Sequence, residues 1–254
     1  MKKPIALITG ATSGIGEATA RLLNDKYRLI ICGRRRERLK KIQGELKSET
    51  QLLTFDVRDR YEVFSVIASL PDEWKEIDVL VNNAGNAHGL DPIHEGNTED
   101  WDAMMDINVK GLLYVSKAII PGMTKRERGH IVNISSIAGS EVYPNGNVYC
   151  ASKHAVDALS KGMRLDLNKF GIKVTSIAPG LVETEFSEVR FKGDTERAKK
   201  VYENYEPLKA VDVAETIKFI LNRPSHVVIG DLLILPTAQA SATLVNKNPN
   251  LGFY

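Results

Sequence analysis

Tyr149 and Lys153 stand four residues apart in this chain, and a phenol and an ammonium group at that spacing can act together as one acid. On a helix, positions i and i+4 share a face, with Cβ atoms roughly 5–6 Å apart. We therefore expect the Lys153 charge to favour the phenolate and to lower the pKa of Tyr149 from its usual value of about 10. Such a tyrosine would exchange a proton near neutral pH. By itself the pair is explained more simply by a surface aromatic beside a solvated charge, so its meaning depends on the other motifs.

A glycine-rich segment near the N-terminus predicts a phosphate site. Residues 5–8 form an apolar run typical of a buried strand, residues 9–16 contain three glycines, and residues 17–27 are amphipathic. Glycines let the backbone approach a pyrophosphate, and a helix N-terminus offers free N–H groups to it. The spacing Gly10-x-x-x-Gly14-x-Gly16 differs from the usual Gly-x-Gly-x-x-Gly. A plain tight turn explains one of these glycines and not three.

Length and composition indicate a single enzyme-sized domain. The chain has 254 residues, of which 43% are hydrophobic and 26% charged, so it can bury a large core. Its formal charge of +2 comes from 34 basic and 32 acidic residues spread along the chain, a balance that makes nucleic acid a poor partner. We see no signal-peptide pattern and no apolar run of the roughly 18–20 residues that a transmembrane helix needs. We therefore expect a cytoplasmic protein without a membrane partner.

Cysteine and histidine usage argues against a metal centre. Cys32 and Cys150 form no C-x-x-C motif and are expected to be small packing residues. The five histidines are scattered without the spacing of metal ligands. We therefore predict no metal site.

Apolar runs alternate with helical patterns along the whole chain. Strands are predicted at residues 5–9, 28–32, 51–55, 79–82, 130–134, 173–177 and 231–235. Strands that are apolar throughout are buried on both faces, which indicates a parallel sheet with helices on either side. We predict an α/β fold: a single-domain, Rossmann-like, doubly wound, seven-stranded parallel sheet, whose ligand lies beyond the strand C-termini. Residues 183–205 are charged and poorly patterned, as in a mobile loop with a short helix.

The motifs together resemble those of the short-chain dehydrogenase/reductase family over nearly the whole chain. Besides the glycine-rich turn, the shared residues are Asn82-Asn83-Ala84-Gly85, Asn108, Ser136, Tyr149-x-x-x-Lys153 and Pro179-Gly180. The resemblance implies that Tyr149 is the general acid/base and that Ser136, rather than Ser135, polarises the substrate oxygen. It also implies that Lys153 holds the nicotinamide ribose and that Asn108 supports a water relay. These roles suit hydride transfer, because the developing alkoxide needs donors in place and a proton within reach.

Within that family, three segments are similar to the bacterial and yeast NADP-dependent 3-hydroxy acid dehydrogenases, also called serine 3-dehydrogenase or L-allo-threonine dehydrogenase. The segments span residues 33–39, 70–74 and 184–194, and the last is the most particular. We assign residues 1–245 to the family's domain, with a substrate loop at about 183–205. Residues 246–254 form a C-terminal tail for which the resemblance offers no counterpart.

The end of the second strand predicts the cofactor. NAD-selective enzymes place Asp or Glu there to accept the ribose 2′-hydroxyl, whereas this chain has Gly33-Arg34-Arg35. A guanidinium forms charge-assisted bonds to phosphate, so we expect NADP, held at its 2′-phosphate by Arg34 with help from Arg35 and Ser13. One or two of the arginines at 34–38 are expected to be merely solvated. The complete set of expected cofactor-binding residues is Gly10, Ser13, Gly14, Ile15, Gly16, Arg34, Arg35, Asp56, Val57, Asn83, Ala84, Gly85, Tyr149, Lys153, Pro179, Gly180, Val182 and Thr184.

We expect the substrate, a small hydroxy acid or carbonyl compound, to contact Ser136, Tyr149 and Arg190. The basic pair Arg190 and Lys192 is flanked by Phe186 and Phe191, just beyond Pro179-Gly180. Residues 185–194 are therefore predicted to close over the substrate while Arg190, with or without Lys192, meets its carboxylate. A solvated, charged loop is the alternative. Two further functions stay open: a reductase of uncharged ketones, aldehydes or other carbonyls, and a non-catalytic NADP-binding sensor.

A homotetramer is expected from the family resemblance. The predicted helices at 101–123 and 149–168 carry apolar residues on more than one stripe, and such helices must bury both stripes. The residues available for the core and the interface together are Met104, Met105, Leu112, Val115, Val156, Leu159 and Met163.

Overall fold

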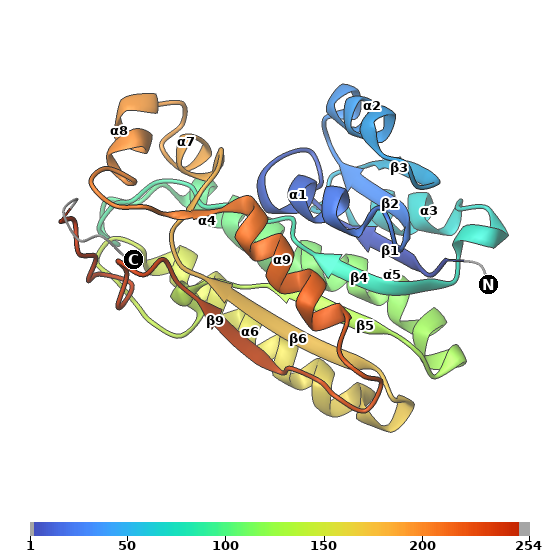
Figure 1. Cartoon of the computed structure of the whole chain (residues 1–254). Coiled ribbons are helices and arrows are strands. Elements are labelled where there is room, and N and C mark those ends of the chain that lie inside the picture. The colour runs from blue at the N-terminus through green and yellow to red at the C-terminus, as the bar shows by residue number, and fades with distance from the viewer. Residues whose placement is uncertain (1–2, 249–254) are drawn as a thin grey trace.

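Seven parallel strands form the central sheet, in the order β3-β2-β1-β4-β5-β6-β9 (Figure 1). The computed structural model describes residues 3–248. Each strand coincides with a predicted apolar run, so the doubly wound, seven-stranded parallel sheet is confirmed. The strands are β1 (Ile5–Ile8), β2 (Arg28–Gly33), β3 (Thr50–Thr54), β4 (Ile77–Asn82), β5 (His130–Ile134), β6 (Lys173–Pro179) and β9 (Asp231–Ile234).

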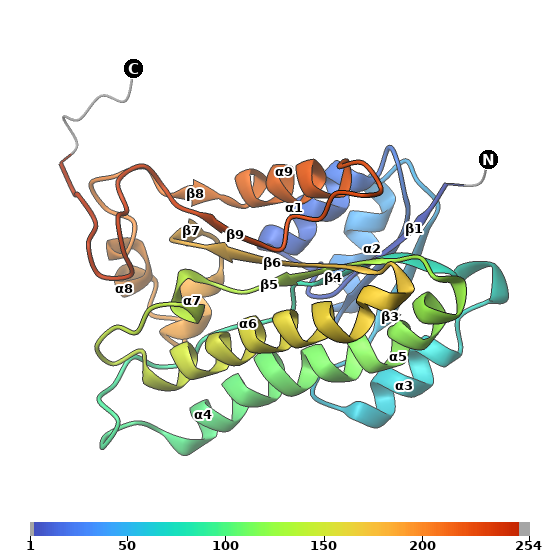
Figure 2. The ribbon, with the colours of Figure 1, turned by 90° about the horizontal axis from the view of Figure 1, so that it is seen from below.

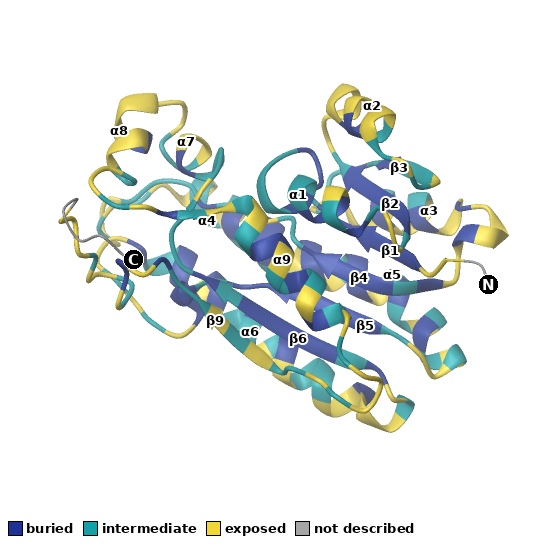
Figure 3. Cartoon of the chain, in the orientation of Figure 1, coloured by how far each residue is buried: buried dark blue, intermediate teal, exposed yellow. Residues whose placement is uncertain are grey.

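Helices cover both faces of this sheet (Figure 2). One face carries α1 (Gly14–Leu23), α2 (Arg36–Glu45) and α9 (Ala210–Leu221), and the other carries α3 (Arg60–Ala68), α5 (Leu112–Arg126) and α6 (Asn147–Leu167). Alternate residues of a strand enter opposite cores: Ile5 and Leu7 pack with α3 and α5, whereas Ala6 and Ile8 pack with α1 and α9. Burial on both faces explains the unbroken apolar strands. In Figure 3 the inner strands are accordingly buried, the edge strands β3 and β9 are partly exposed, and the outer sides of the helices are exposed.

The helix predicted at 101–123 is divided by a π-helical turn. It begins as α4 (Thr98–Met105), whose N-cap residue Asn97 accepts bonds from the N–H groups of Glu99 and Asp100, and it continues after the turn Asp106–Gly111 as α5. A π-turn inserts an extra residue into the helix and often marks a functional site. Here the turn carries Asn108, which is buried.

The segment at 183–205 has more secondary structure than the sequence predicted. Strands β7 (Val182–Glu183) and β8 (Leu208–Lys209) pair in parallel, and between them lie α7 (Phe186–Arg190) and α8 (Thr195–Lys200). The Tyr202 hydroxyl braces the segment, because it donates to the Val182 carbonyl (2.9 Å) and bonds the Ser187 hydroxyl (2.7 Å). These elements are too short to produce a periodic apolar pattern, and the brace joins residues distant in sequence. We call residues 183–205 the lid.

Short 3-10 helices complete the fold at Asp72–Trp74, Ile137–Gly139 and Asn168–Phe170. Within residues 3–248, every helix is too short or too polar to cross a lipid bilayer. Of the predicted C-terminal tail, residues 249–254 lie outside the described residues.

Candidate active site

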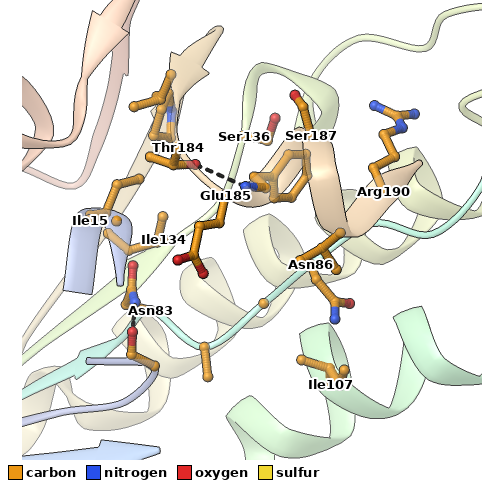
Figure 4. Close-up of a pocket in the computed structure, with 18 of the residues that line it drawn as sticks. Ile15, Asn83, Asn86, Ile107, Ile134, Ser136, Thr184, Glu185, Ser187 and Arg190 are labelled. Atoms are coloured by element: carbon orange, nitrogen blue, oxygen red, sulfur yellow. Dashed lines mark hydrogen bonds between the residues drawn. The ribbon is translucent and has the colours of Figure 1, made fainter. Parts of the chain in front are cut away.

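Two loops are tied together where the sheet order reverses, between β1 and β4. The Thr9 hydroxyl accepts the N–H groups of Asn83 and Ala84, each at 3.0 Å. The Asn83 amide donates in return to the carbonyls of Thr9 (3.0 Å) and Gly10 (3.2 Å), and Figure 4 shows Asn83 in this position. In doubly wound sheets, ligands bind in the crevice at this reversal point.

The glycine-rich turn is shaped by close backbone contacts. Gly10 has φ +64, and a Cβ there would lie 2.9 Å from the Ala84 Cα. A Cβ on Gly16 would lie 2.4 Å from the Gly10 carbonyl oxygen, so Gly16 brings α1 against the turn. Ser13 precedes α1 without capping it through its side chain, which leaves the first N–H groups of the helix without that partner.

A cavity of about 520 Å³ opens at this edge of the sheet, within the range of ligand sites. Nearly all of the predicted site residues line it, from the glycine-rich turn at one end to Tyr149 and Arg190 at the other. The exceptions are Gly16 and Asn108. Both lie behind the cavity wall, so the prediction that Gly16 contacts the cofactor is not supported by its position.

Tyr149 lies in the first turn of α6, with 8% of its surface exposed. Burial raises its pKa, and the nearby Tyr143 adds to the rise, whereas the Ser136 hydroxyl and the Arg190 charge act to lower it. The expectation that Lys153 lowers this pKa is therefore wrong for the protein alone. The helical spacing does place the two on one face, but the Lys153 Nζ lies 6.0 Å from the ring centroid and donates to the Ile134 carbonyl at 2.9 Å.

Lys153 is itself buried, with 6% of its surface exposed. Burial lowers its pKa to about 8, against a smaller opposing effect of Asp157. A Cβ on Gly85 would lie 3.5 Å from the Lys153 Nζ and 3.0 Å from the Asn108 Oδ1. The ammonium group thus lies against the Asn83-Ala84-Gly85 loop, at the wall of the cavity.

Asn108 fixes that loop from behind. Its Nδ2 donates to the Asn86 carbonyl (2.8 Å) and the Ser152 hydroxyl (2.9 Å), and its Oδ1 accepts the Asn86 N–H (2.9 Å). The Ser152 hydroxyl in turn donates to the Tyr149 carbonyl at 2.7 Å. The Asn108 side chain therefore joins the loop after β4 to α6; its part in a water relay stays a prediction.

The two adjacent serines have different partners. The Ser136 hydroxyl caps the short helix Ile137–Gly139 by accepting the Ala138 N–H at 3.1 Å, and it is close enough to the Tyr149 phenol to act on its pKa. The Ser135 hydroxyl instead contacts the Lys153 carbonyl at 3.5 Å. This arrangement favours Ser136 as the partner of Tyr149.

The arginines after β2 lie at the far end of the cavity. Arg34 is 60% exposed and its Nη1 lies 3.6 Å from the Asp56 carboxylate. Arg35 is more constrained, because it donates to the hydroxyls of Thr12 (2.8 and 3.1 Å) and Ser13 (2.8 Å). Asp56 is held mainly by Arg58, whose hydrogen bonds outweigh burial and lower the pKa of the carboxyl. Arg34 is thus the freer guanidinium.

Arg190 crosses from the lid to the opposite wall of the cavity. Its Nε donates to the Gly89 carbonyl (3.2 Å) and its Nη2 to the Tyr143 hydroxyl (3.1 Å). Lys192, its expected helper, pairs with Asp100 at 2.9 Å and does not line the cavity. The suggestion that Lys192 meets the substrate is therefore not supported, because its ammonium is directed to another carboxylate.

Sequence reasoning missed three residues that shape this cavity. Thr12 orients Arg35, Tyr143 contacts Arg190, and Glu185 pairs with Arg35 at 2.9 Å. Thr12 lies within the recognised turn and was findable there. Tyr143 and Glu185 carry no local signal, since each acts on a residue about 50 or 150 positions away.

Comparisons with known proteins agree with this geometry. The model of the short chain dehydrogenase family matches residues 4–195. The chain is 47% identical over 242 residues to NADP-dependent 3-hydroxy acid dehydrogenase YdfG of Salmonella typhi, covering 94% of this chain and 98% of that one. It is 42% identical over 247 residues to NADP-dependent 3-hydroxy acid dehydrogenase of Schizosaccharomyces pombe, covering 95% of each.

Solved structures give the same assignment. The closed form of serine dehydrogenase complexed with NADP+ superposes with a TM-score of 0.92 at 46% identity, covering 94% of this chain and 98% of that one. Serine dehydrogenase from Escherichia coli has a TM-score of 0.82 at 40% identity, covering 93% and 99%. This chain belongs to the short chain dehydrogenase family.

Proposed function

We propose that the protein is an NADP-dependent oxidoreductase that interconverts a small 3-hydroxy acid, of the serine or allo-threonine type, with the corresponding 3-oxo acid. The observation that carries the proposal is the convergence of Ser136, Tyr149 and Lys153 on one cavity whose lid brings a guanidinium, Arg190, to within 5.5 Å of the Tyr149 ring. The names of its relatives supply independent support.

The residues present fit NADP. The turn at Gly10 lets a phosphate approach the backbone, the uncapped start of α1 offers N–H groups, and Arg34 with Arg35 would hold the 2′-phosphate. Asp56 and Val57 would flank the adenine end, and Lys153 and Asn83 the nicotinamide end. When bound, the cofactor supplies the acceptor or donor of the hydride.

The chain's own residues manage the proton and the oxygen. The Tyr149 hydroxyl would take the proton of the substrate hydroxyl on oxidation and return it on reduction. Ser136, which acts to lower the pKa of that phenol, would hold the same substrate oxygen. The Lys153 ammonium, next to the loop at Gly85, would stabilise the phenolate once it forms. Burial of the phenol makes such stabilisation necessary, because an unaided phenolate there is disfavoured.

Arg190 would bind the substrate carboxylate. Its guanidinium lies over the Tyr143 and Tyr149 rings, at 5.6 and 5.5 Å from their centroids, so an acid bound to it would present its carbon chain to Tyr149. A charge-assisted pair of this kind orients as well as binds.

A reductase of uncharged carbonyls is the second candidate. The same end of the cavity holds the apolar side chains Leu90, Ile137, Phe186 and Val189, and the Phe186 ring packs edge-on to Tyr149 at 5.7 Å. These surfaces suit a substrate without a carboxylate. A non-catalytic NADP sensor is less consistent with the site, since binding alone does not require Ser136 and Tyr149 to meet.

We further propose a homotetramer in the cytoplasm. Four of the residues assigned to the core and interface together, namely Met104, Leu112, Val115 and Val156, are fully used by the core of the single chain. Leu113 on α5 and Leu165 on α6 are 37% and 81% exposed, so these two would contribute to an interface.

The proposed function is tested by following NADPH absorbance with a panel of substrates. Serine, allo-threonine and other 3-hydroxy acids are compared with alcohols of similar size that lack the carboxylate, each with NADP+ and with NAD+. The proposal predicts the highest kcat/KM for a 3-hydroxy acid with NADP+. Turnover of the uncharged alcohols alone would establish the second candidate, and tight NADP+ binding without any turnover would establish the sensor.

A further inference from the structure

The lid helix α7 is anchored at both of its ends. At its C-terminal end, Arg190 donates to the Gly89 carbonyl, and its own carbonyl accepts the Gly89 N–H at 3.0 Å. At its N-terminal end, Glu185 pairs with arginines from the start of α2. The two side chains point in opposite directions from α7 (Figure 4). The helix thus spans the cavity between the loop after β4 and the segment after β2.

Glu185 is held by two guanidinium groups. Its Oε2 accepts from the Arg35 Nη1 at 2.9 Å, and its Oε1 accepts from the Arg38 Nη1 at 2.6 Å. Each carboxylate oxygen therefore has its own charged donor. These hydrogen bonds outweigh partial burial and keep the pKa of Glu185 below its usual value, so the carboxylate is ionised at neutral pH.

One of the two arginines also belongs to the cofactor end of the cavity. The remaining nitrogens of Arg35 donate to the hydroxyls of Thr12 and Ser13 in the glycine-rich turn. Arg38 lies one helical turn further along α2 and does not line the cavity. The lid, α2 and the glycine-rich turn are consequently joined in one network of charges and hydroxyls.

We propose that Glu185 is a positioning residue: through Arg35 and Arg38 it latches the substrate lid to the cofactor-binding turn, and so keeps α7 closed over the site. Arg190 grips the opposite wall independently, so loss of the Glu185 latch frees one end of α7 and leaves the other attached. The lid then opens more often, and substrate-binding groups on α7 are less often in place.

The solvent exposure of the three paired side chains sets how strongly their ion pairs hold the lid closed. The side chains of Glu185, Arg35 and Arg38 are 40%, 43% and 48% exposed, and ion pairs in such surroundings are weak and screened by salt. Breaking the latch should raise the open population about 2- to 5-fold, the range typical of an exposed pair.

Limited trypsin digestion of the protein without substrate measures that population directly. The lid offers exposed cleavage sites at Lys192, Arg197, Lys199 and Lys200, and cleavage of a transiently open segment tracks how often it opens. Glu185→Gln and Arg38→Ala should each speed the first cleavage in the lid about 2- to 5-fold, and the double variant should cleave no faster than the quicker single variant.

Two control variants remove the same kinds of charge from α7 and α2 at residues that do not take part in the Glu185 ion pairs. Glu188 on α7 and Arg36 on α2 are exposed and form no side-chain hydrogen bond or ion pair with any residue in the range 3–248, so Glu188→Gln and Arg36→Ala should cleave at the wild-type rate. Wild-type cleavage of the Glu185→Gln lid, or equal acceleration by the control variants, would overturn the proposal.

Steady-state kinetics test how loss of the Glu185 ion pairs affects substrate binding and turnover, an effect that rests on the proposed function. Glu185→Gln should raise KM for the turned-over substrate about 2- to 5-fold with little change in kcat, and the difference from wild type should shrink as salt is added. A loss confined to kcat, or one insensitive to salt, would reject the positioning role. If no hydroxy acid is turned over at all, the proposed function fails, while the digestion result still decides the latch.

Discussion

The guanidinium carbon of Arg190 lies 5.5 Å from the centroid of the Tyr149 ring. This contact joins the lid to the group that we expect to exchange the proton, and it puts a positive charge beside a phenol whose pKa burial has raised. The Arg190 guanidinium is therefore suited to two tasks: it can bind an anionic substrate, and it can favour ionisation of the Tyr149 phenol. Only substrates with a carboxylate would be bound by it in this way.

Tyr149→Phe should abolish turnover while leaving the fold and NADPH binding intact, because it removes the proton donor and little else. Proton transfer by a positioned side chain contributes typically 10²–10⁴-fold. Steady-state kinetics and NADPH fluorescence titration check the two parts separately. Activity above about a tenth of the wild-type value would contradict the role given to Tyr149.

Lys153 makes stability depend on pH in a defined window. Burial lowers its pKa from the usual 10.5 to about 8 in the folded protein. Between these two values the unfolded chain holds more protons, so the free energy of unfolding rises with pH. Below about pH 8 the buried charge lowers stability. The full difference is of the order of 3 kcal/mol.

Lys153→Met should lack that dependence. Urea unfolding of both proteins at about pH 7.5 and about pH 10.5 gives the comparison, since the pH effects of other groups cancel in the difference. We expect wild-type stability to gain relative to Lys153→Met as pH rises. A constant difference would mean that Lys153 keeps its ordinary pKa, and a difference of opposite sign would mean that folding raises it; either result would contradict the prediction.

Arg34→Ala should weaken NADP binding about 10- to 100-fold and leave NAD binding nearly unchanged. The reason is that a charge-assisted hydrogen bond to the 2′-phosphate is worth roughly 1.5–3 kcal/mol, and Arg34 is the less constrained arginine at that end of the cavity. Dissociation constants of both cofactors test this. Equal losses for the two would show that the 2′-phosphate is held elsewhere.

The protein should have the mass of a tetramer at micromolar concentration. Exposed Leu165 and half-exposed Leu113 are the apolar groups that an interface along α5 and α6 would cover. Light scattering coupled to size-exclusion chromatography measures the mass. Leu165→Asp should shift it towards smaller species, whereas a monomer in the wild type would refute the assembly.

The sheet was predictable because burial on both faces leaves a signal within each strand. Runs such as residues 5–8 and 29–32 are apolar throughout, and strand-end residues such as Asn83 and Ser136 fall at one edge by topology alone. Asn108 was identified as a site residue, but the π-turn that carries it was not foreseen, because one extra residue per turn hardly alters an apolar pattern.

Electrostatic details were the least predictable. The spacing of Tyr149 and Lys153 correctly gives a shared helix face, yet it says nothing about desolvation or about the Ile134 carbonyl that Lys153 contacts. Likewise, Glu185 and Arg35 are 150 positions apart, so their pairing depends on the whole fold. The ion pair between Lys192 and Asp100 could not be predicted for the same reason, since Asp100 lies on a helix distant in the sequence.

The most direct test of the central claim is the ratio of kcat/KM for a 3-hydroxy acid to that for an alcohol of similar size without the carboxylate, measured with NADP+ in wild type and in Arg190→Ala. We predict that wild type prefers the acid and that Arg190→Ala loses roughly 1.5–3 kcal/mol on the acid, about 10- to 100-fold, and little on the alcohol. Tyr143→Phe, which removes one contact of Arg190 but keeps its charge, serves as the control and should retain most of the preference. Equal losses on both substrates would contradict the account, because Arg190 would then only hold the lid in shape.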